Sequence, residues 1–222
     1  MSSPATTLVC FALPDEARPF RKLARAHPHA EILVTGMGAR NAERVLRARL
    51  AGPRPALVLT CGFAGGLNPA LPPLTLLFSP DAPVAVHAAL LATGARPGAF
   101  HCAPRVVTTA AEKRALFAET NGDAVEMESG VIQKICGEKG IPCVTLRVIS
   151  DAANEDLPLD FNRLTTAEQN LDFLKLAVVI ARAPSKIPAL LALGKRTAAA
   201  AKTLAHALDQ FLRPRLGSEF RL

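Results

Sequence analysis

The sequence has no tryptophan and no tyrosine, and its aromatic residues are ten phenylalanines. Proteins that bind single-stranded nucleic acid stack the bases on aromatic side chains, so we expect no nucleic-acid partner despite a formal net charge of +7. The five cysteines include no CxxC pair, and their odd number suits a reducing compartment. The five histidines show no HExxH spacing, so we expect no metal site.

Further absences narrow the class of protein. The turn at residues 36–40, Gly-Met-Gly-Ala-Arg, lacks the third glycine of a dinucleotide fingerprint, which disfavours hydride transfer. The uncharged run between Arg54 and Asp81 is interrupted by glycine and proline, so we expect no spanning helix and no membrane partner. The first 20 residues lack the basic start of a signal peptide. We therefore expect a cytoplasmic protein.

Apolar runs alternate with helical patterns along the chain. The sequence predicts strands at residues 7–13, 31–35, 56–61, 74–79, 106–109, 124–128 and 143–150, and helices at residues 15–27, 39–50, 129–139, 165–182 and 195–212. This order predicts an α/β fold with a mainly parallel, mixed and twisted sheet flanked by helices. We expect a single domain over residues 1–222, in which residues 184–222 form a C-terminal helical appendage after a linker at residues 181–194.

Carboxylates stand at the ends of two of the predicted strands. Glu126 and Glu128 close one strand, where alternation would point both to one face, and Ser150 and Asp151 close another. Ligands of α/β sheets bind at the carboxyl ends of the strands, so a crevice lined by carboxylates is predicted. Each acid also has a structural interpretation: Asp151 as a helix cap, Glu16 as a cap of its own helix, and Glu128 as a buried partner of Arg147.

The segment Gly62-Phe63-Ala64-Gly65-Gly66 is predicted to be a glycine-rich turn at the carboxyl end of the strand at residues 56–61. Glycines allow a ligand to approach the backbone and allow N–H groups to point into a crevice. Five segments then occur in order: Pro14-Asp15-Glu16, Thr35-Gly36-Met37-Gly38, Cys61 to Leu67, Val125 to Ser129, and Arg147 to Asp151. Together they resemble the purine nucleoside phosphorylase and nucleosidase superfamily, especially its methylthioadenosine/S-adenosylhomocysteine nucleosidase branch.

The resemblance implies cleavage of the N-glycosidic bond of an adenine-type nucleoside, without a metal or organic cofactor. It implies that Asp151 is the general acid toward the purine, that Glu16 activates the attacking water, and that Glu128 and Met127 hold the ribose. The other substrate-binding candidates are Phe63, Ala64, Gly65, Val106, Glu126 and Ser150, and the candidate anion-binding residues are Gly38, Arg40 and Arg147.

These roles agree with the chemistry of the reaction. The sugar becomes positive as the bond breaks, while the departing base takes up a proton. Asp151 would therefore have to hold a proton near neutral pH, for which burial among apolar residues is the available means, whereas Glu16 would have to be ionised. Two carboxyl groups in opposite states are typical of an acid/base pair.

Two alternatives remain open. Phosphorylases of the superfamily usually carry arginine where this chain has Glu16, which favours water as co-substrate, but Arg18, Arg21 and Arg40 are close enough in sequence to reach a phosphate. Short superfamily members of hopanoid synthesis, phosphorylases of an adenosine-bearing lipid, also resemble this chain. A catalytically weak nucleoside-binding protein is the second alternative, because residues 67–125 are shorter than in the nucleosidases. The resemblance further implies a homodimer.

Overall fold

A computed structural model describes residues 6–164, 166 and 173–213 of the chain. Within these residues, eight strands form one sheet with the order β2-β1-β3-β8-β4-β5, and β7 joins it by pairing with β3 and β6. The strands are β1 (Thr7–Phe11), β2 (Ala30–Val34), β3 (Leu57–Gly66), β4 (Leu76–Phe78), β5 (Arg96–Pro97), β6 (Phe100–Cys102), β7 (Ala124–Glu126) and β8 (Cys143–Asp151).

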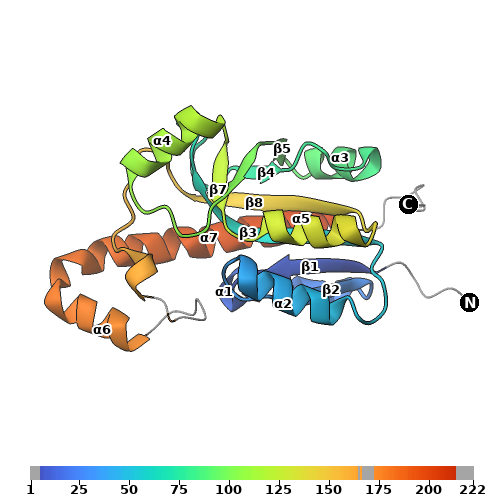
Figure 1. Cartoon of the computed structure of the whole chain (residues 1–222), viewed down its shortest axis with the longest axis horizontal. Helices are drawn as coiled ribbons and strands as arrows, with labels where there is room; N and C mark the ends of the chain where they lie inside the picture. Colours follow the sequence, from blue (N-terminus) through green and yellow to red (C-terminus); the bar gives the residue numbers. More distant parts are fainter. Residues whose placement is uncertain (1–5, 165, 167–172, 214–222) are drawn as a thin grey trace, which may run out of the picture.

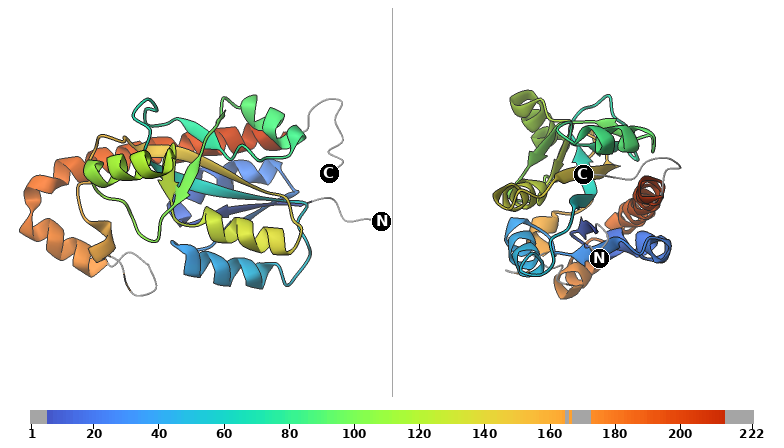
Figure 2. Two further views of the ribbon diagram at one scale, coloured as in Figure 1. Left: turned by 45° about the horizontal axis from the view of Figure 1, so that its top comes forward. Right: turned by 90° about the vertical axis from the view of Figure 1, so that its right-hand side faces the viewer.

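The helices lie on both faces of this sheet (Figures 1 and 2). They are α1 (Pro14–Leu23), α2 (Ala39–Arg49), α3 (Val84–Leu91), α4 (Ala110–Thr120), α5 (Ser129–Glu138), α6 (Phe173–Arg182) and α7 (Ile187–Leu212), with short 3-10 turns at Ala24–Ala26, Phe161–Leu164 and Pro184–Lys186. Strands β1, β2, β3 and β8 are parallel to their neighbours in this set, whereas β4 and β7 run antiparallel to β8 and β3. The predicted mixed α/β class is confirmed.

Alternate residues of the central strands enter two separate cores. Val9 and Phe11 of β1 pack with α1, α3 and α7 on one face, while Leu8 and Cys10 pack with α2 and α5 on the other. Successive side chains of a strand point to opposite faces, so a strand covered on both sides has no polar alternation. This explains why the runs at β1, β3 and β8 are nearly continuous in apolar residues.

The carboxyl ends of β1, β2, β3 and β8 meet at one edge of the sheet because these strands are parallel. β3 and β8 stay paired from Val58 and Cys143 as far as Gly65 and Asp151, with a register shift after Ala64. The segment at residues 62–66, predicted to be a turn, therefore continues β3, and Gly65 and Gly66 also pair with β7. The glycines extend the strand instead of ending it.

Residues 106–109 are not a strand, contrary to the prediction. Thr109 is the N-cap of α4, where its hydroxyl oxygen accepts a hydrogen bond from the Glu112 amide while the Glu112 carboxylate accepts one from the Thr109 amide. This is a capping box, which outweighs the β-branched character of Val106 and Val107. The sequence interpretation also missed α3, whose apolar residues show no helical period.

α7 begins at Ile187, so most of the linker predicted at residues 181–194 is helical. Leu204, Leu208 and Phe211 of this helix are buried and belong to the same core as β1, β3 and β8. The side chain of His27 also bonds Asp209 of α7, with 2.9 Å between Nε2 and Oδ1. The apolar stripe of the last helix thus packs against this chain itself. The described part of the predicted helix at residues 165–182 is α6.

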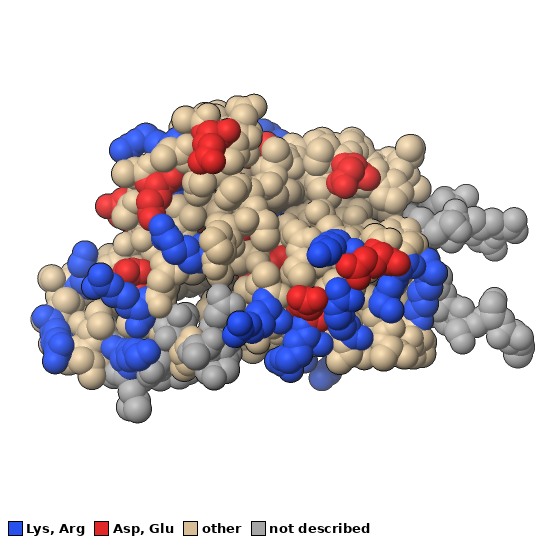
Figure 3. Space-filling model, viewed as in Figure 1, with Lys and Arg blue, Asp and Glu red and all other residues tan. Residues whose placement is uncertain are grey.

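Charged side chains of both signs cover the face shown in Figure 3, where Lys and Arg are most frequent over α2 and around α6. The Lys and Arg residues of these helices therefore lie on solvent-exposed surface, as expected for most charge runs. None of the helices in the described part of the chain is both long enough and apolar enough to cross a membrane.

Candidate functional site

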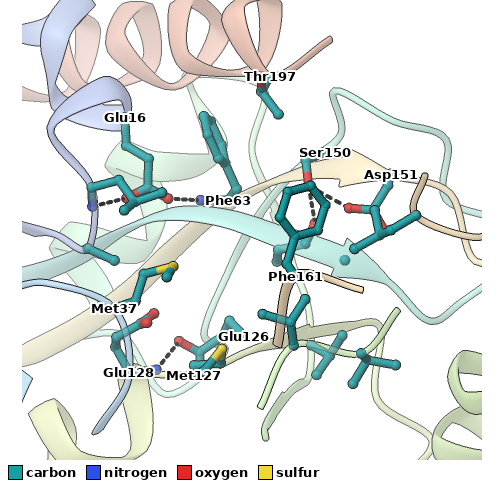
Figure 4. A pocket seen from close by; sticks show the side chains of 18 of the residues that line it. Glu16, Met37, Phe63, Glu126, Met127, Glu128, Ser150, Asp151, Phe161 and Thr197 are labelled. Carbon is teal, nitrogen blue, oxygen red and sulfur yellow. Dashed lines mark hydrogen bonds between the residues drawn. The ribbon is translucent and has the colours of Figure 1, made fainter. Parts of the chain in front are cut away.

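A cavity of about 250 Å³ opens at the edge where the parallel strands end. Its wall comes from the ends of β1, β3, β7 and β8, the segment before α4, the 3-10 turn Phe161–Leu164, and α7. Figure 4 shows Glu16 and Asp151 on opposite sides of this pocket, with Met127 and Glu128 on a third side. The acids that the sequence places at separate strand ends therefore share one pocket.

Glu16 lies in the first turn of α1 and is buried. Its Oε2 accepts a hydrogen bond from the Leu13 amide and its Oε1 accepts one from the Phe63 amide, each at 2.8 Å. Burial raises the pKa of Glu16 to about 7, although Arg147 and the two amides oppose the shift. The carboxyl group therefore caps its own helix and also reaches the pocket, so the structural and the functional interpretation of Glu16 both hold.

Glu126 and Glu128 share a buried partner, Arg147 of β8. The Arg147 Nη2 lies 2.5 Å from Glu126 Oε2 and 3.3 Å from Glu128 Oε2. Glu126 also accepts bonds from the Glu128 amide and from the amide and hydroxyl of Ser129. Glu128 accepts fewer bonds from other elements, with one from the Gly38 amide at 2.8 Å besides that of Arg147. Glu128 is the carboxylate with capacity left for a ligand hydroxyl.

The two glutamates differ in their tendency to ionise. Burial alone would raise the pKa of Glu126, but Arg147 and the donors from Ser129 outweigh it and hold that pKa below its usual value. Burial raises the pKa of Glu128, with Glu126 adding to the shift and Arg147 opposing it. The same acids raise the pKa of Arg147 in spite of its burial. One guanidinium thus faces three buried carboxyl groups, and this end of the pocket is electronegative.

Gly62 makes room for this cluster. A Cβ at this position would lie 2.5 Å from Arg147 Nη1 and 2.6 Å from Glu16 Oε1. The glycine is thus needed for the approach of two side chains of the protein, whereas the sequence argument assigned the glycines of this segment to the approach of a ligand.

Asp151 ends β8 and is buried. Its Oδ1 accepts a hydrogen bond from the Ser150 hydroxyl at 2.6 Å, and its Oδ2 lies 2.5 Å from the ammonium of Lys113. The sequence predicts apolar surroundings for this carboxyl group. The structure places the ammonium of Lys113 directly beside it.

Apolar side chains line the remaining wall near Asp151. The backbone of Val106 is held by Asn162, whose Oδ1 accepts from the Val106 amide and whose Nδ2 donates to the Val106 carbonyl, at 3.0 and 2.9 Å. The Leu157 amide also donates to the Thr108 carbonyl. These bonds join the chain after β8 to the segment before α4, and so place Phe161 and Val106 on the same wall. An apolar wall beside an acid suits a heterocyclic base.

All ten residues predicted as catalytic or substrate-binding line this one cavity. The three anion-binding candidates do not line it. Arg40 is exposed on α2, the Gly38 amide already binds the carboxylate of Glu128, and Arg147 lies behind the carboxylates that it pairs with. Their binding of an external anion stays a prediction. In the described part of the chain, no group of three or more His, Cys, Asp or Glu side chains is arranged to hold a metal ion.

Several residues of the site escaped the sequence interpretation. Met37, Phe161, Leu193 and Thr197 line the pocket, and Lys113 contacts Asp151 from behind. Met37 lies in a segment that carries the family resemblance, so a signal for it existed. Phe161, Thr197 and Lys113 stand outside every recognisable motif.

A family model described as the phosphorylase superfamily matches residues 84–181. The resemblance to that superfamily is confirmed. The 5′-methylthioadenosine/S-adenosylhomocysteine nucleosidase of Mycobacterium bovis is 46% identical over 48 residues, which are 22% of this chain and 19% of that protein. The aminodeoxyfutalosine nucleosidase of Helicobacter pylori is 32% identical over 85 residues, which are 37% of each chain.

Solved structures show the same fold. A mutant of Helicobacter pylori MTAN, with 5′-methylthioadenosine in its active site, matches with a TM-score of 0.69 at 16% identity, over 94% of this chain and 98% of that chain. The fold is therefore of the nucleoside phosphorylase and nucleosidase type. The sequence matches span only 19% and 37% of the two curated relatives, so they carry the family resemblance and leave activity and substrate to the geometry of the site.

Proposed function

We propose that this protein is a nucleosidase that hydrolyses the N-glycosidic bond of an adenine-type nucleoside. The observation that carries the proposal is the placement of Glu16 and Asp151 on opposite sides of one buried pocket, with Glu128 and Met127 beside them. Hydrolysis of this bond needs a base for water on one side of the sugar and a proton donor for the leaving group on the other. The relatives named above are nucleosidases, which supports the same reaction class.

The sugar end of the pocket suits a cationic transition state. The sugar gains positive charge as the bond breaks, and fixed negative groups in a buried site stabilise that charge. Glu16 and Glu128 reach the cavity, and Arg147 offsets only part of the negative charge of the cluster. We assign Glu128 to the ribose hydroxyls, because its oxygens retain accepting capacity, and Met127 to the apolar face of the sugar.

Water is favoured over phosphate as co-substrate. Phosphate binding calls for cationic side chains or free amides directed into the site. Among the described residues that line the cavity, the only Lys or Arg is Arg105, which pairs with Glu112 at 2.5 Å. Glu16, with a pKa near 7, has instead the properties of a base that accepts a proton from water.

Phosphorolysis stays the second candidate because of one neighbouring feature. A hollow of about 680 Å³ between α1 and α7 shares Phe63 and Thr197 with the site. Arg18, Lys22 and Lys202 line it, against a single acid, Asp15, among its lining residues. Because Phe63 and Thr197 line both cavities, an anion held there would lie next to the nucleoside pocket.

Adenine release from 5′-methylthioadenosine, S-adenosylhomocysteine, adenosine and aminodeoxyfutalosine, with and without phosphate, tests the proposal. We expect free sugar at the same rate in both buffers, and a loss of about 100-fold or more in Glu16→Gln and Asp151→Asn. Glu119→Gln, which removes an exposed carboxylate of α4, is the matched control and should keep full activity. Sugar 1-phosphate formed only with phosphate would establish phosphorolysis, and adenosine binding without turnover would indicate a non-catalytic binder.

A further inference from the structure

Lys113 is a buried lysine in the first turns of α4, with none of its surface exposed. Its Nζ lies 2.5 Å from Asp151 Oδ2 and donates to the carbonyl oxygens of Ala152 and Glu155, each at 2.8 Å. A lysine ammonium has three N–H donors, so all of them are used. Lysine is almost never fully buried unless it is paired, and the acid that pairs with it here lines the pocket.

The position of Lys113 is set independently of any ligand. The capping box of Thr109 and Glu112 fixes the start of α4 one turn before it. Its two carbonyl partners belong to the chain that follows β8, and Arg196 of α7 holds Glu155 of that chain through two bonds of 2.6 and 2.7 Å. The position of the ammonium is therefore fixed by α4, by the chain after β8 and, through Glu155, by α7.

The ammonium determines how Asp151 can act. It occupies Oδ2 while the Ser150 hydroxyl occupies Oδ1, so the carboxyl plane is fixed. The ammonium also places a second source of protons in contact with Asp151. A purine leaves far more readily after it has gained a proton.

We propose that Lys113 is a positioning residue that acts through Asp151 and that the proton taken up by the leaving base is drawn from the Lys113–Asp151 pair. This inference rests on the proposed nucleosidase function. As the C–N bond breaks, its electron pair stays with the base, a ring nitrogen accepts a proton from Asp151, and Asp151 takes a proton from the Lys113 ammonium, which becomes an amine. The water that attacks the sugar passes its proton to Glu16, and exchange with solvent then restores both groups.

The dependence of the rate on the leaving group tests this role. For 5′-methylthioadenosine we expect Lys113→Met to lower kcat about 100-fold, the size typical of general acid catalysis. A 4-nitrophenyl riboside, whose leaving group departs without a proton, should be cleaved within about threefold of the wild-type rate. Lys134→Met, at an exposed lysine of α5, is the control. Equal losses with both substrates, or no loss with either, would overturn the proposal.

A second comparison covers the case in which Lys113→Met fails to fold because it leaves Asp151 buried without its partner. The double variant Lys113→Met/Asp151→Asn removes both charges. If Lys113 acts only through Asp151, the double variant should release adenine no more slowly than Asp151→Asn alone, because coupled residues are not additive. A further loss in the double variant would show that Lys113 acts by another route and would contradict the proposal.

Binding of free adenine separates this inference from the proposed function. We expect Lys113→Met to bind adenine about tenfold more weakly than the wild type in calorimetry, because Asp151, the hydrogen-bond partner of the base, loses the ammonium that orients it. Where that variant does not fold, the double variant is compared with Asp151→Asn and should bind adenine equally well. If the wild type binds adenine but releases it from no nucleoside, the proposed function is wrong. The adenine affinity of the variants then still tests whether Lys113 orients Asp151. Unchanged affinity of Lys113→Met for adenine, or weaker binding by the double variant than by Asp151→Asn, would overturn the role of Lys113.

Discussion

Four buried charged side chains determine the electrostatics of the sugar end of the pocket. Glu16, Glu126 and Glu128 surround Arg147, and a single guanidinium cannot neutralise three carboxylates. Two of these acids respond to the burial by binding protons more tightly, whereas Glu126 stays ionised because of its many donors. The pocket can therefore change its charge near neutral pH through Glu16.

The rate of adenine release should depend on the ionisation of Glu16. The base must be a carboxylate to accept a proton from water, and the raised pKa of about 7 means that the ionised fraction grows as the pH rises through 7. We expect kcat/KM to fall below about pH 7, whereas an exposed glutamate would keep its charge down to about pH 4.3. Initial rates measured across this range, with thermal melts at each pH to confirm folding, check this. A flat profile between pH 5 and 8 would exclude Glu16 as the base.

At the scale of secondary-structure elements, β3 and β8 carry the site. Their paired carboxyl ends place Phe63, Ala64 and Gly65 beside Ser150 and Asp151. α1 and α5 then begin directly after β1 and β7, so that Glu16 and Glu128 are presented from the helix starts at the same edge of the sheet. A change in the backbone of β3 should therefore disturb acids on other elements.

Gly62→Ala is the sharpest change of this kind. The added Cβ would be within 2.6 Å of atoms of both Arg147 and Glu16, so these side chains have to move. Small displacements of catalytic groups can cost about 100-fold in rate, and we expect kcat to fall at least tenfold. The control is Gly137→Ala on α5, where a Cβ has nothing within 4 Å and alanine is the better helix former. Activity assays and thermal melts of both variants measure the loss of rate and check that the variants fold. Full activity of Gly62→Ala would contradict the expected displacement of Arg147 and Glu16.

At the scale of the whole molecule, the last helix completes both the core and the site. α7 buries Leu204, Leu208 and Phe211 against β1, β3 and β8, and it contributes Leu193 and Thr197 to the pocket. The predicted single domain and homodimer stay predictions, as does the cytoplasmic location. The packing of α7 within this chain means that its apolar stripe is not a free surface for a partner subunit.

Leu208→Ala tests the contribution of α7 to stability. Leu208 is fully buried in the main core, and replacing such a leucine by alanine lowers the free energy of unfolding by about 2 to 5 kcal/mol. Leu191→Ala is the matched control on the same helix, since Leu191 is 62% exposed and should change stability little. Denaturant unfolding measures the free energy of unfolding of both variants. Equal effects of the two variants would contradict the packing of α7 against the sheet.

The sequence by itself determined the α/β class, most of the strands, and the acids at their ends. These features depend on local patterns: apolar runs mark buried strands, and parallel strands bring their carboxyl ends to one edge whatever the rest of the chain does. Glu16 and Asp151 follow parallel strands and could therefore be placed at one edge from the sequence. Glu128 follows β7, which runs antiparallel to β3, and its place in the site was implied by the family resemblance.

Only the tertiary structure decided which distant residues complete that site. Phe161 and Thr197 line the pocket and Lys113 contacts Asp151 from behind it, and these three residues lie in segments far apart in the sequence. The local signals were also misleading where two preferences competed, as at residues 106–109, where a helix cap outweighed β-branched side chains. The contact of Asp151 with a lysine 38 positions away could not be predicted, because it depends on distance in space and not in sequence.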